Sequence, residues 1–168
     1  MGRLRHSLAA AGLLLAVASP AAAGTPPGAA PAVVVALGGI GVEPGEDAAG
    51  ALELQYRFAP AYEGVQPEVG AFVASDESAY GWLGFGRDFP FARRWVAHIS
   101  FGAGAYERGD GKELGQTLEF RSAIDVAWRA SERLRIGLML AHLSNAGLSE
   151  INPGTETLTV SFAWRPRR

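Results

Sequence analysis

The sequence alternates between apolar and polar residues over segments of about ten residues, and this pattern constrains the fold most strongly. In one segment, Leu52, Leu54 and Tyr56 alternate with Glu53, Gln55 and Arg57. A period of two indicates a β-strand, because successive side chains of a strand point to opposite faces. Eight strands are predicted, at 33–42, 49–58, 67–75, 79–87, 94–106, 115–129, 133–144 and 155–164.

The length of these segments matches a tilted strand that crosses a bilayer, which needs roughly 9–11 residues. The polar faces carry both signs of charge, as with Arg121 and Asp125, and such ions can pair inside a narrow lumen. We therefore predict an all-β fold, an eight-stranded antiparallel transmembrane β-barrel. Alternation alone leaves open a soluble barrel whose apolar face points inward. His98 falls on the lumen face and is interpreted as a structural residue.

Aromatic residues and connections agree with a membrane barrel. Four tryptophans lie near segment ends, where an aromatic girdle is expected: Trp82, Trp95, Trp128 and Trp164. With both ends of the barrel in the periplasm, the turn at 130–132 is periplasmic and short. The longer connections around 41–48, 107–114 and 145–154 are then external, as is usual for such barrels.

The N-terminal segment is predicted to be an export signal. Arg3 and Arg5 precede an apolar run from Leu8 to Ala18, and the small residues 21–23 suit cleavage before Gly24. The run is short for a membrane-spanning helix, although a retained anchor is an alternative. The expected organisation is a signal peptide at 1–23, a flexible lead-in at 24–32 and a barrel domain at 33–168. The chain has no cysteine, so disulfides cannot stabilise it, and its net charge of −2 argues against a nucleic-acid partner.

A polar cluster interrupts the lipid-facing positions of the last two segments. The parity of Leu138 and Leu140 continues to His142 and Ser144, and that of Leu158 runs back to Glu156. If His142 pairs opposite Glu156, a carboxylate lies beside one ring nitrogen and a hydroxyl near the other. This is the order of orienting acid, base and nucleophile in serine hydrolases.

The cluster therefore predicts ester hydrolysis. An amide or a glycine N–H of the connecting loop, which holds Asn145, Gly147, Asn152 and Gly154, could bind the oxyanion. The alternative interpretation is an interfacial histidine followed by an ordinary turn.

The run from His142 to Gly147, followed by Asn152 and Glu156, resembles the active-site segment of the lipid A 3-O-deacylases, the PagL family. The resemblance implies an eight-stranded outer-membrane barrel that hydrolyses the ester at the 3 position of lipid A and releases a 3-hydroxy fatty acid. It implies that Ser144 is the nucleophile, His142 the base and Glu156 the orienting acid. It further implies that Asn152 and the backbone near Gly147 form the oxyanion hole, with Asn145 in support.

The resemblance implies no metal or organic cofactor. The expected partners are lipid A or lipopolysaccharide as substrate and the lipids of the outer membrane, and a homodimer is left open. Two other functions are weighed against the hydrolase: a non-catalytic outer-membrane scaffold or adhesion protein, and a soluble periplasmic barrel that carries an apolar ligand.

Overall fold

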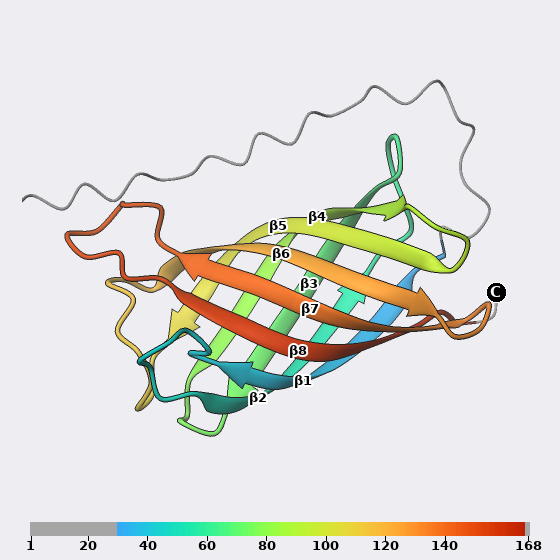
Figure 1. Cartoon of the computed structure of the whole chain (residues 1–168). Coiled ribbons are helices and arrows are strands. Elements are labelled where there is room, and N and C mark those ends of the chain that lie inside the picture. Colours follow the sequence, from blue (N-terminus) through green and yellow to red (C-terminus); the bar gives the residue numbers. More distant parts are fainter. Residues whose placement is uncertain (1–29, 167–168) are drawn as a thin grey trace, which may run out of the picture.

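The computed structural model describes residues 30–166, which form a closed antiparallel β-barrel (Figure 1). Each strand pairs with the next along the chain, and the last pairs with the first, so the described sheet has no open edge. The eight strands are β1 (Ala32–Ile40), β2 (Ala49–Arg57), β3 (Val65–Ala74), β4 (Ala79–Pro90), β5 (Trp95–Glu107), β6 (Leu118–Arg129), β7 (Leu134–Ser144) and β8 (Thr155–Trp164). The predicted eight-stranded antiparallel barrel is confirmed. The predicted signal peptide lies outside the described residues.

Most strand boundaries differ from the prediction by one to three residues. Two of these differences have a clear cause, because glycines in the left-handed region interrupt the extended backbone. β1 ends at Ile40, before Gly41 with φ 71°, and not at residue 42. β6 begins at Leu118, after Gly115 with φ 101°, so residues 115–117 belong to the preceding loop.

The barrel has two distinct ends. The start of β1 and the finish of β8 lie at one end, called the terminal end here, together with the connections 58–64, 91–94 and 130–133. The opposite end, the loop end, carries the connections 41–48, 75–78, 108–117 and 145–154. Figure 1 shows the loop 145–154 extending beyond the barrel at this end. Residues 30–166 include no helix that is both long and apolar enough to cross a membrane.

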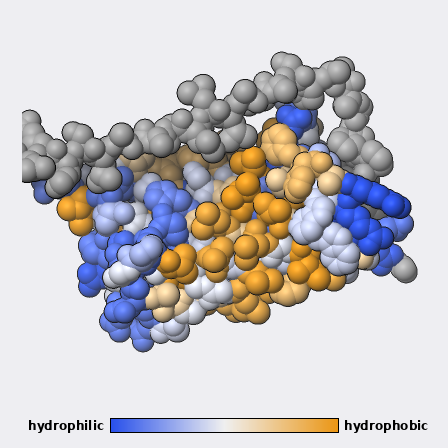
Figure 2. All heavy atoms as spheres, in the orientation of Figure 1, coloured by the Kyte–Doolittle hydropathy of each residue, from blue (hydrophilic) through white to orange (hydrophobic). Residues whose placement is uncertain are grey.

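The outer wall of the barrel is apolar. Large hydrophobic side chains such as Leu54, Leu83 and Leu138 are exposed, Leu83 by 73%. Figure 2 shows hydrophobic residues gathered over the middle of the visible face, with hydrophilic residues toward both ends. An apolar wall of this extent suits contact with lipid and is the reverse of a soluble barrel.

The inside of the barrel holds paired charges, as predicted. Arg121 Nη2 lies 2.8 Å from Glu53 Oε1, and Arg57 Nη2 lies 3.1 Å from Asp125 Oδ2, with all four side chains buried. Each partner offsets the cost of burying the other, because an isolated buried charge is strongly unfavourable. These long polar side chains fill the lumen near the middle of the sheet.

His98 belongs to this interior network, as expected. Its Nε2 lies 3.1 Å from Glu68 Oε2 and its Nδ1 lies 2.9 Å from Asp88 Oδ1. Asp88 also accepts hydrogen bonds from Arg135 (2.8 Å) and Arg165 (3.1 Å), and so joins β4 to β7 and to the segment after β8.

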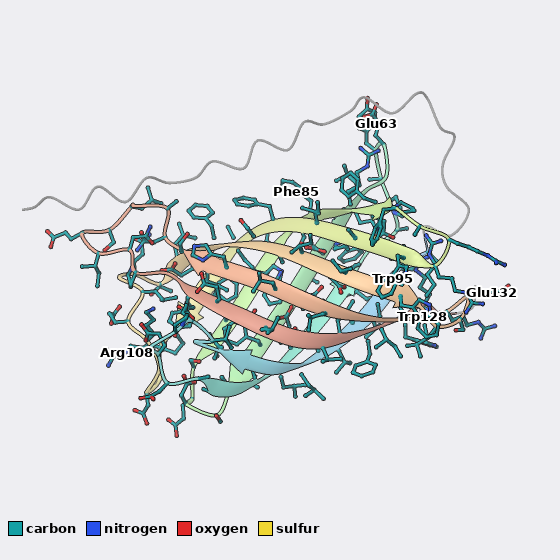
Figure 3. The ribbon with its side chains drawn as sticks, viewed as in Figure 1. Glu63, Phe85, Trp95, Arg108, Trp128 and Glu132 are labelled. Atoms are coloured by element: carbon teal, nitrogen blue, oxygen red, sulfur yellow. The ribbon has the colours of Figure 1, made fainter. Side chains whose placement is uncertain are left out.

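The predicted aromatic girdle is correct for three tryptophans and wrong for Trp82. Trp95 and Trp128 pair across β5 and β6 near the terminal end (Figure 3), and Trp164 is likewise exposed. Trp82 is buried inside the barrel, where its ring stacks on Tyr80 with a centroid distance of 5.5 Å.

The parity of β4 and a nearby glycine explain the inward position of Trp82. Trp82 shares its face of β4 with the buried Tyr80, and the Arg121 guanidinium lies 4.5 Å from the centroid of its ring. Gly70, its cross-strand neighbour on β3, leaves the required space, because a Cβ there would overlap the indole ring. Closeness to a strand end therefore did not decide which way the side chain points.

Candidate active site

The β7–β8 hairpin brings His142 and Glu156 together. The two residues are direct cross-strand partners, and His142 Nδ1 lies 2.9 Å from Glu156 Oε1. Both side chains are on the outer face, with 49% of the His142 side chain and 32% of the Glu156 side chain exposed. The predicted pairing across the hairpin is therefore confirmed. The contact leaves Nε2 as the ring nitrogen that Glu156 does not engage.

Ser144 is the last residue of β7 and lies on the same face as His142. Residues two apart on a strand have Cα atoms about 7 Å apart, so their side chains are neighbours. Ser144 is half-buried, and within residues 30–166 no hydrogen bond joins its hydroxyl to the His142 ring. Hydrogen bonds between a nucleophile and its base are often long without substrate and shorten when the substrate binds.

Asn145 holds the loop 145–154 in place. It is completely buried, and its Nδ2 donates to the carbonyl oxygens of Leu114 (2.7 Å) and Ile151 (2.8 Å). Its Oδ1 accepts from the Gly147 N–H (2.9 Å), and its own N–H donates to Asn152 Oδ1 (3.0 Å). Both polar atoms of the Asn145 amide group therefore bind backbone groups of the loops. This geometry agrees with the expectation that Asn145 supports the site.

The same contacts bear on the oxyanion donors expected from the sequence. The Gly147 N–H is already engaged by Asn145, so it would need to be released to bind an oxyanion. Asn152 is different, because the atom that accepts from the Asn145 N–H must be its oxygen. Its Nδ2 amide group is then the donor that Asn152 still presents. The structure thus brings both predicted residues into one loop but leaves only Asn152 with an uncommitted donor.

Gly154 has a steric role that was not predicted from the sequence. It adopts φ 66°, and a Cβ built on it would lie 2.8 Å from Cε1 of His142 and 3.2 Å from the Leu143 carbonyl oxygen. A side chain here would push against the imidazole. Sequence reasoning considered Gly154 only as an N–H donor, because the close approach depends on how the hairpin closes.

A shallow groove leads away from His142 along the outer wall. It has a volume of about 410 Å³ and crosses β5, β6 and β7. Most of its side chains are apolar, and its full lining is Ile99, Ser100, Phe101, Ser122, Ala123, Ile124, Leu140 and His142. The Phe101 ring stacks on the Phe120 ring with a centroid distance of 6.0 Å and forms part of the aromatic surface beside it. Sequence analysis missed this groove because three strands build it.

Loop 41–48 supports the site from the side of β1. The Gly41 N–H donates to the Glu156 carbonyl oxygen at 2.9 Å. Farther along the loop, Glu43 and Glu46 bind Lys112 of the loop 108–117, with Nζ–Oε1 distances of 3.2 and 3.0 Å. Burial opposes ionisation of Glu43, but hydrogen bonds from backbone groups and Lys112 outweigh it and hold the pKa of Glu43 below its usual value of 4.5. The two loops are therefore joined by charge at neutral pH.

The groups at this site suit acid–base and nucleophilic chemistry. Among residues 30–166, no three or more histidines, aspartates or glutamates are grouped so that they could hold a metal ion. A carboxylate, an imidazole and a neighbouring hydroxyl are the groups that ester hydrolysis by a serine nucleophile requires.

Comparisons with known proteins agree with the fold and indicate a family. The family model described as lipid A 3-O-deacylase (PagL) matches residues 50–165, which include the whole β7–β8 hairpin. The lipid A deacylase PagL of Bordetella bronchiseptica is 28% identical over 108 residues, which cover 59% of this chain and 61% of that relative. The chain thus spans less than two thirds of the relative's length.

Solved structures show the same barrel. The crystal structure of the outer membrane enzyme PagL has a TM-score of 0.57 and 21% identity, and the match covers 80% of this chain and 99% of that chain. A de novo designed transmembrane β-barrel gives a TM-score of 0.58 at 12% identity, over 82% of this chain and 96% of that chain. The family match and the closed barrel confirm the prediction of an outer-membrane protein. The chain belongs to the lipid A 3-O-deacylase (PagL) family.

Proposed function

We propose that this protein is a serine-type ester hydrolase that removes the 3-linked 3-hydroxyacyl chain of lipid A. The observation that carries the proposal is the contact between His142 and Glu156 on the outer wall, next to Ser144. Soluble hydrolases usually place such groups in a water-filled cleft. Here they lie on the surface that faces lipid, so a membrane lipid can approach from the side.

Each of the three groups has its own role in the proposed reaction. His142 Nε2 takes the proton of the Ser144 hydroxyl while Oγ attacks the ester carbonyl carbon. The tetrahedral intermediate collapses, and the sugar hydroxyl leaves with the proton that His142 carries. Water, deprotonated by His142, then attacks the acyl carbonyl carbon. The bond from Ser144 Oγ to the acyl group breaks as His142 returns the proton to Oγ, which frees the serine and releases the 3-hydroxy fatty acid. Glu156 accepts the Nδ1–H throughout, which fixes the tautomer and stabilises the imidazolium.

The developing oxyanion needs a donor near Ser144. We assign this role to the Nδ2 amide group of Asn152, since the Oδ1 atom of the same side chain is held by the Asn145 N–H. Asn145 keeps the loop in the required shape through its contacts with Leu114 and Ile151.

The groove beside His142 is the proposed site of the acyl chain. It is lined by His142 together with Leu140, Ile124 and Phe101, so a chain whose carbonyl lies at Ser144 can enter it. The loop end faces outward in this proposal, because external connections of such barrels are usually the longer ones. The site then lies at the outer leaflet. His142, Ser144 and Glu156 come from one hairpin, so a second copy of the chain is not needed for the reaction.

Mass spectrometry of lipid A from a Gram-negative host that expresses the protein tests the proposal. Wild type is expected to remove one 3-hydroxyacyl group, and Ser144→Ala is expected to lower deacylation by about three orders of magnitude or more. Ser131→Ala, a serine change in the turn at the terminal end, is the matched control and is expected to keep the activity. Barrel folding is checked for each protein by its heat-dependent migration on gels.

Two results would contradict the proposal. Full deacylation by folded Ser144→Ala and His142→Ala variants would exclude the assigned nucleophile and base. Unchanged lipid A in cells that contain folded wild type would support the non-catalytic scaffold instead.

A further inference from the structure

Ser122 is a polar residue at an outward-facing position of β6. It lies between Phe120 and Ile124 on the exposed face of the strand, and in the described part of the chain no hydrogen bond involves its hydroxyl. A hydroxyl that faces hydrocarbon without a partner is unfavourable. Such a residue is therefore expected to find its partner in a ligand.

The position of Ser122 relates it directly to the proposed active site. Ser122 pairs with His142 across β6 and β7, and Ser144 pairs with Phe120. Ser122 and Ser144 are thus diagonal neighbours, with Cα atoms roughly 7–8 Å apart on the same face. Ser122 also lines the groove that begins at His142. An acyl chain that enters this groove from Ser144 passes Ser122 within its first few carbons.

The chemistry of the chain supplies a partner at that place. A 3-hydroxyacyl chain carries its hydroxyl two carbons beyond the ester carbonyl, whereas the rest of the chain is hydrocarbon. Ile124 and Leu140, which line the groove beside Ser122, offer this hydroxyl no hydrogen bond. Of the other polar groove residues, Ser100 is buried on the lumen side of β5 and His142 serves the ester in the proposed function. A hydroxyl on each side can donate to and accept from the other.

We propose that Ser122 is a specificity-determining residue that hydrogen-bonds the 3-hydroxyl of the acyl chain and so favours 3-hydroxyacyl esters. The inference rests on the proposed function. A chain without the hydroxyl leaves Ser122 unpaired in an apolar groove, and sites that lose a polar partner in this way discriminate against the analogue. Ser122 acts on the choice of chain, whereas Ser144 and His142 act on the ester itself.

The test compares two lipid A analogues in detergent micelles, with 3-linked chains of equal length that do or do not carry the 3-hydroxyl. The measured quantity is the ratio of the two kcat/KM values. Wild type is expected to favour the hydroxylated ester by roughly 3- to 10-fold, the range for one neutral hydrogen bond. Ser122→Ala is expected to bring the ratio close to one, and Ser122→Thr, which keeps a hydroxyl, to restore most of the preference.

Leu140→Ala is the matched control in the same groove. It removes apolar contact with both chains, so it is expected to lower both kcat/KM values and to keep their ratio. A ratio in Ser122→Ala equal to that of wild type overturns the inference, and so does an equal loss on both esters. Wild type that hydrolyses neither ester overturns the proposed function, and the inference with it.

Discussion

Gly154→Ala is the change that most directly tests whether the position of the His142 ring controls activity. The added Cβ would lie 2.8 Å from Cε1 of His142. An ordinary carbon–carbon contact begins near 3.4 Å, so the ring or the loop must move by about 0.6 Å. The Nδ1–Oε1 contact with Glu156, now 2.9 Å, is on the same ring and is disturbed by the same movement.

The expected loss follows from this displacement. Misplacing a reacting group by about 1 Å can lower a rate by roughly 100-fold, so a shift of about 0.6 Å predicts a decrease of at least about 10-fold in kcat/KM. A 10-fold decrease corresponds to about 1.4 kcal/mol in the activation barrier. Alanine at φ 66° also costs roughly 1–2 kcal/mol of stability, because its Cβ clashes with the backbone in the left-handed region.

Gly45→Ala separates the loss of activity from the loss of stability. Gly45 also has a positive φ, 92°, but a Cβ there meets no atom within 4 Å. Both variants are expected to unfold at lower urea concentration than wild type, and only Gly154→Ala is expected to lose activity. Release of fatty acid from lipid A in micelles and urea unfolding followed by tryptophan fluorescence provide the two measurements. Equal kcat/KM values for the two alanine variants would refute the reasoning.

Two further predictions concern the interior and the loops. Gly70→Ala is expected to destabilise the barrel by about 1–3 kcal/mol in urea unfolding, because the new Cβ overlaps Trp82. A Cβ at Gly81 meets nothing within 4 Å, so Gly81→Ala should unfold near the wild-type midpoint. Similar midpoints for the two variants would contradict the packing argument. The depressed pKa of Glu43 means that its contact with Lys112 contributes stability above about pH 4.5, a contribution that is lost as the pH falls through the lower pKa of the folded state. Lys112→Met should therefore unfold at lower urea concentration than wild type at pH 7, with a difference that shrinks below pH 4.5; a difference independent of pH would count against the assigned contact.

Much of the fold could be predicted because a membrane barrel obeys a simple alternation. Each strand has one face toward lipid and one toward the lumen, so parity alone placed Leu54 outside and Arg57 inside. The same parity placed His142 and Glu156 on the outer faces of neighbouring strands, so that they could be cross-strand partners, as the structure shows. The outward position predicted for Trp82 was wrong because it rested on closeness to a strand end. The parity of β4 places Trp82 inside the barrel, with Tyr80.

Features that depend on contacts between distant segments could not be predicted in this way. Asn145 is fixed by the carbonyl of Leu114, which lies 31 positions earlier in the sequence. The groove needs the register of three strands, although one sign of it was readable: Ser122 interrupts the apolar residues on the outer face of β6. Whether the Gly147 N–H is committed likewise depends on the final shape of the loop.

The hydrogen bond from Gly41 to the carbonyl of Glu156 has a consequence for when the proposed hydrolysis can begin. Glu156 is on the last strand, and Gly41 directly follows the first, so this bond forms only after the two ends of the sheet have met. In a β7–β8 hairpin on its own, Glu156 would be held by β7 and would lack the hydrogen bond from the β1 side. If the proposed function holds, hydrolysis is expected to start only at barrel closure, so that a newly made chain does not attack esters before it is seated in its membrane.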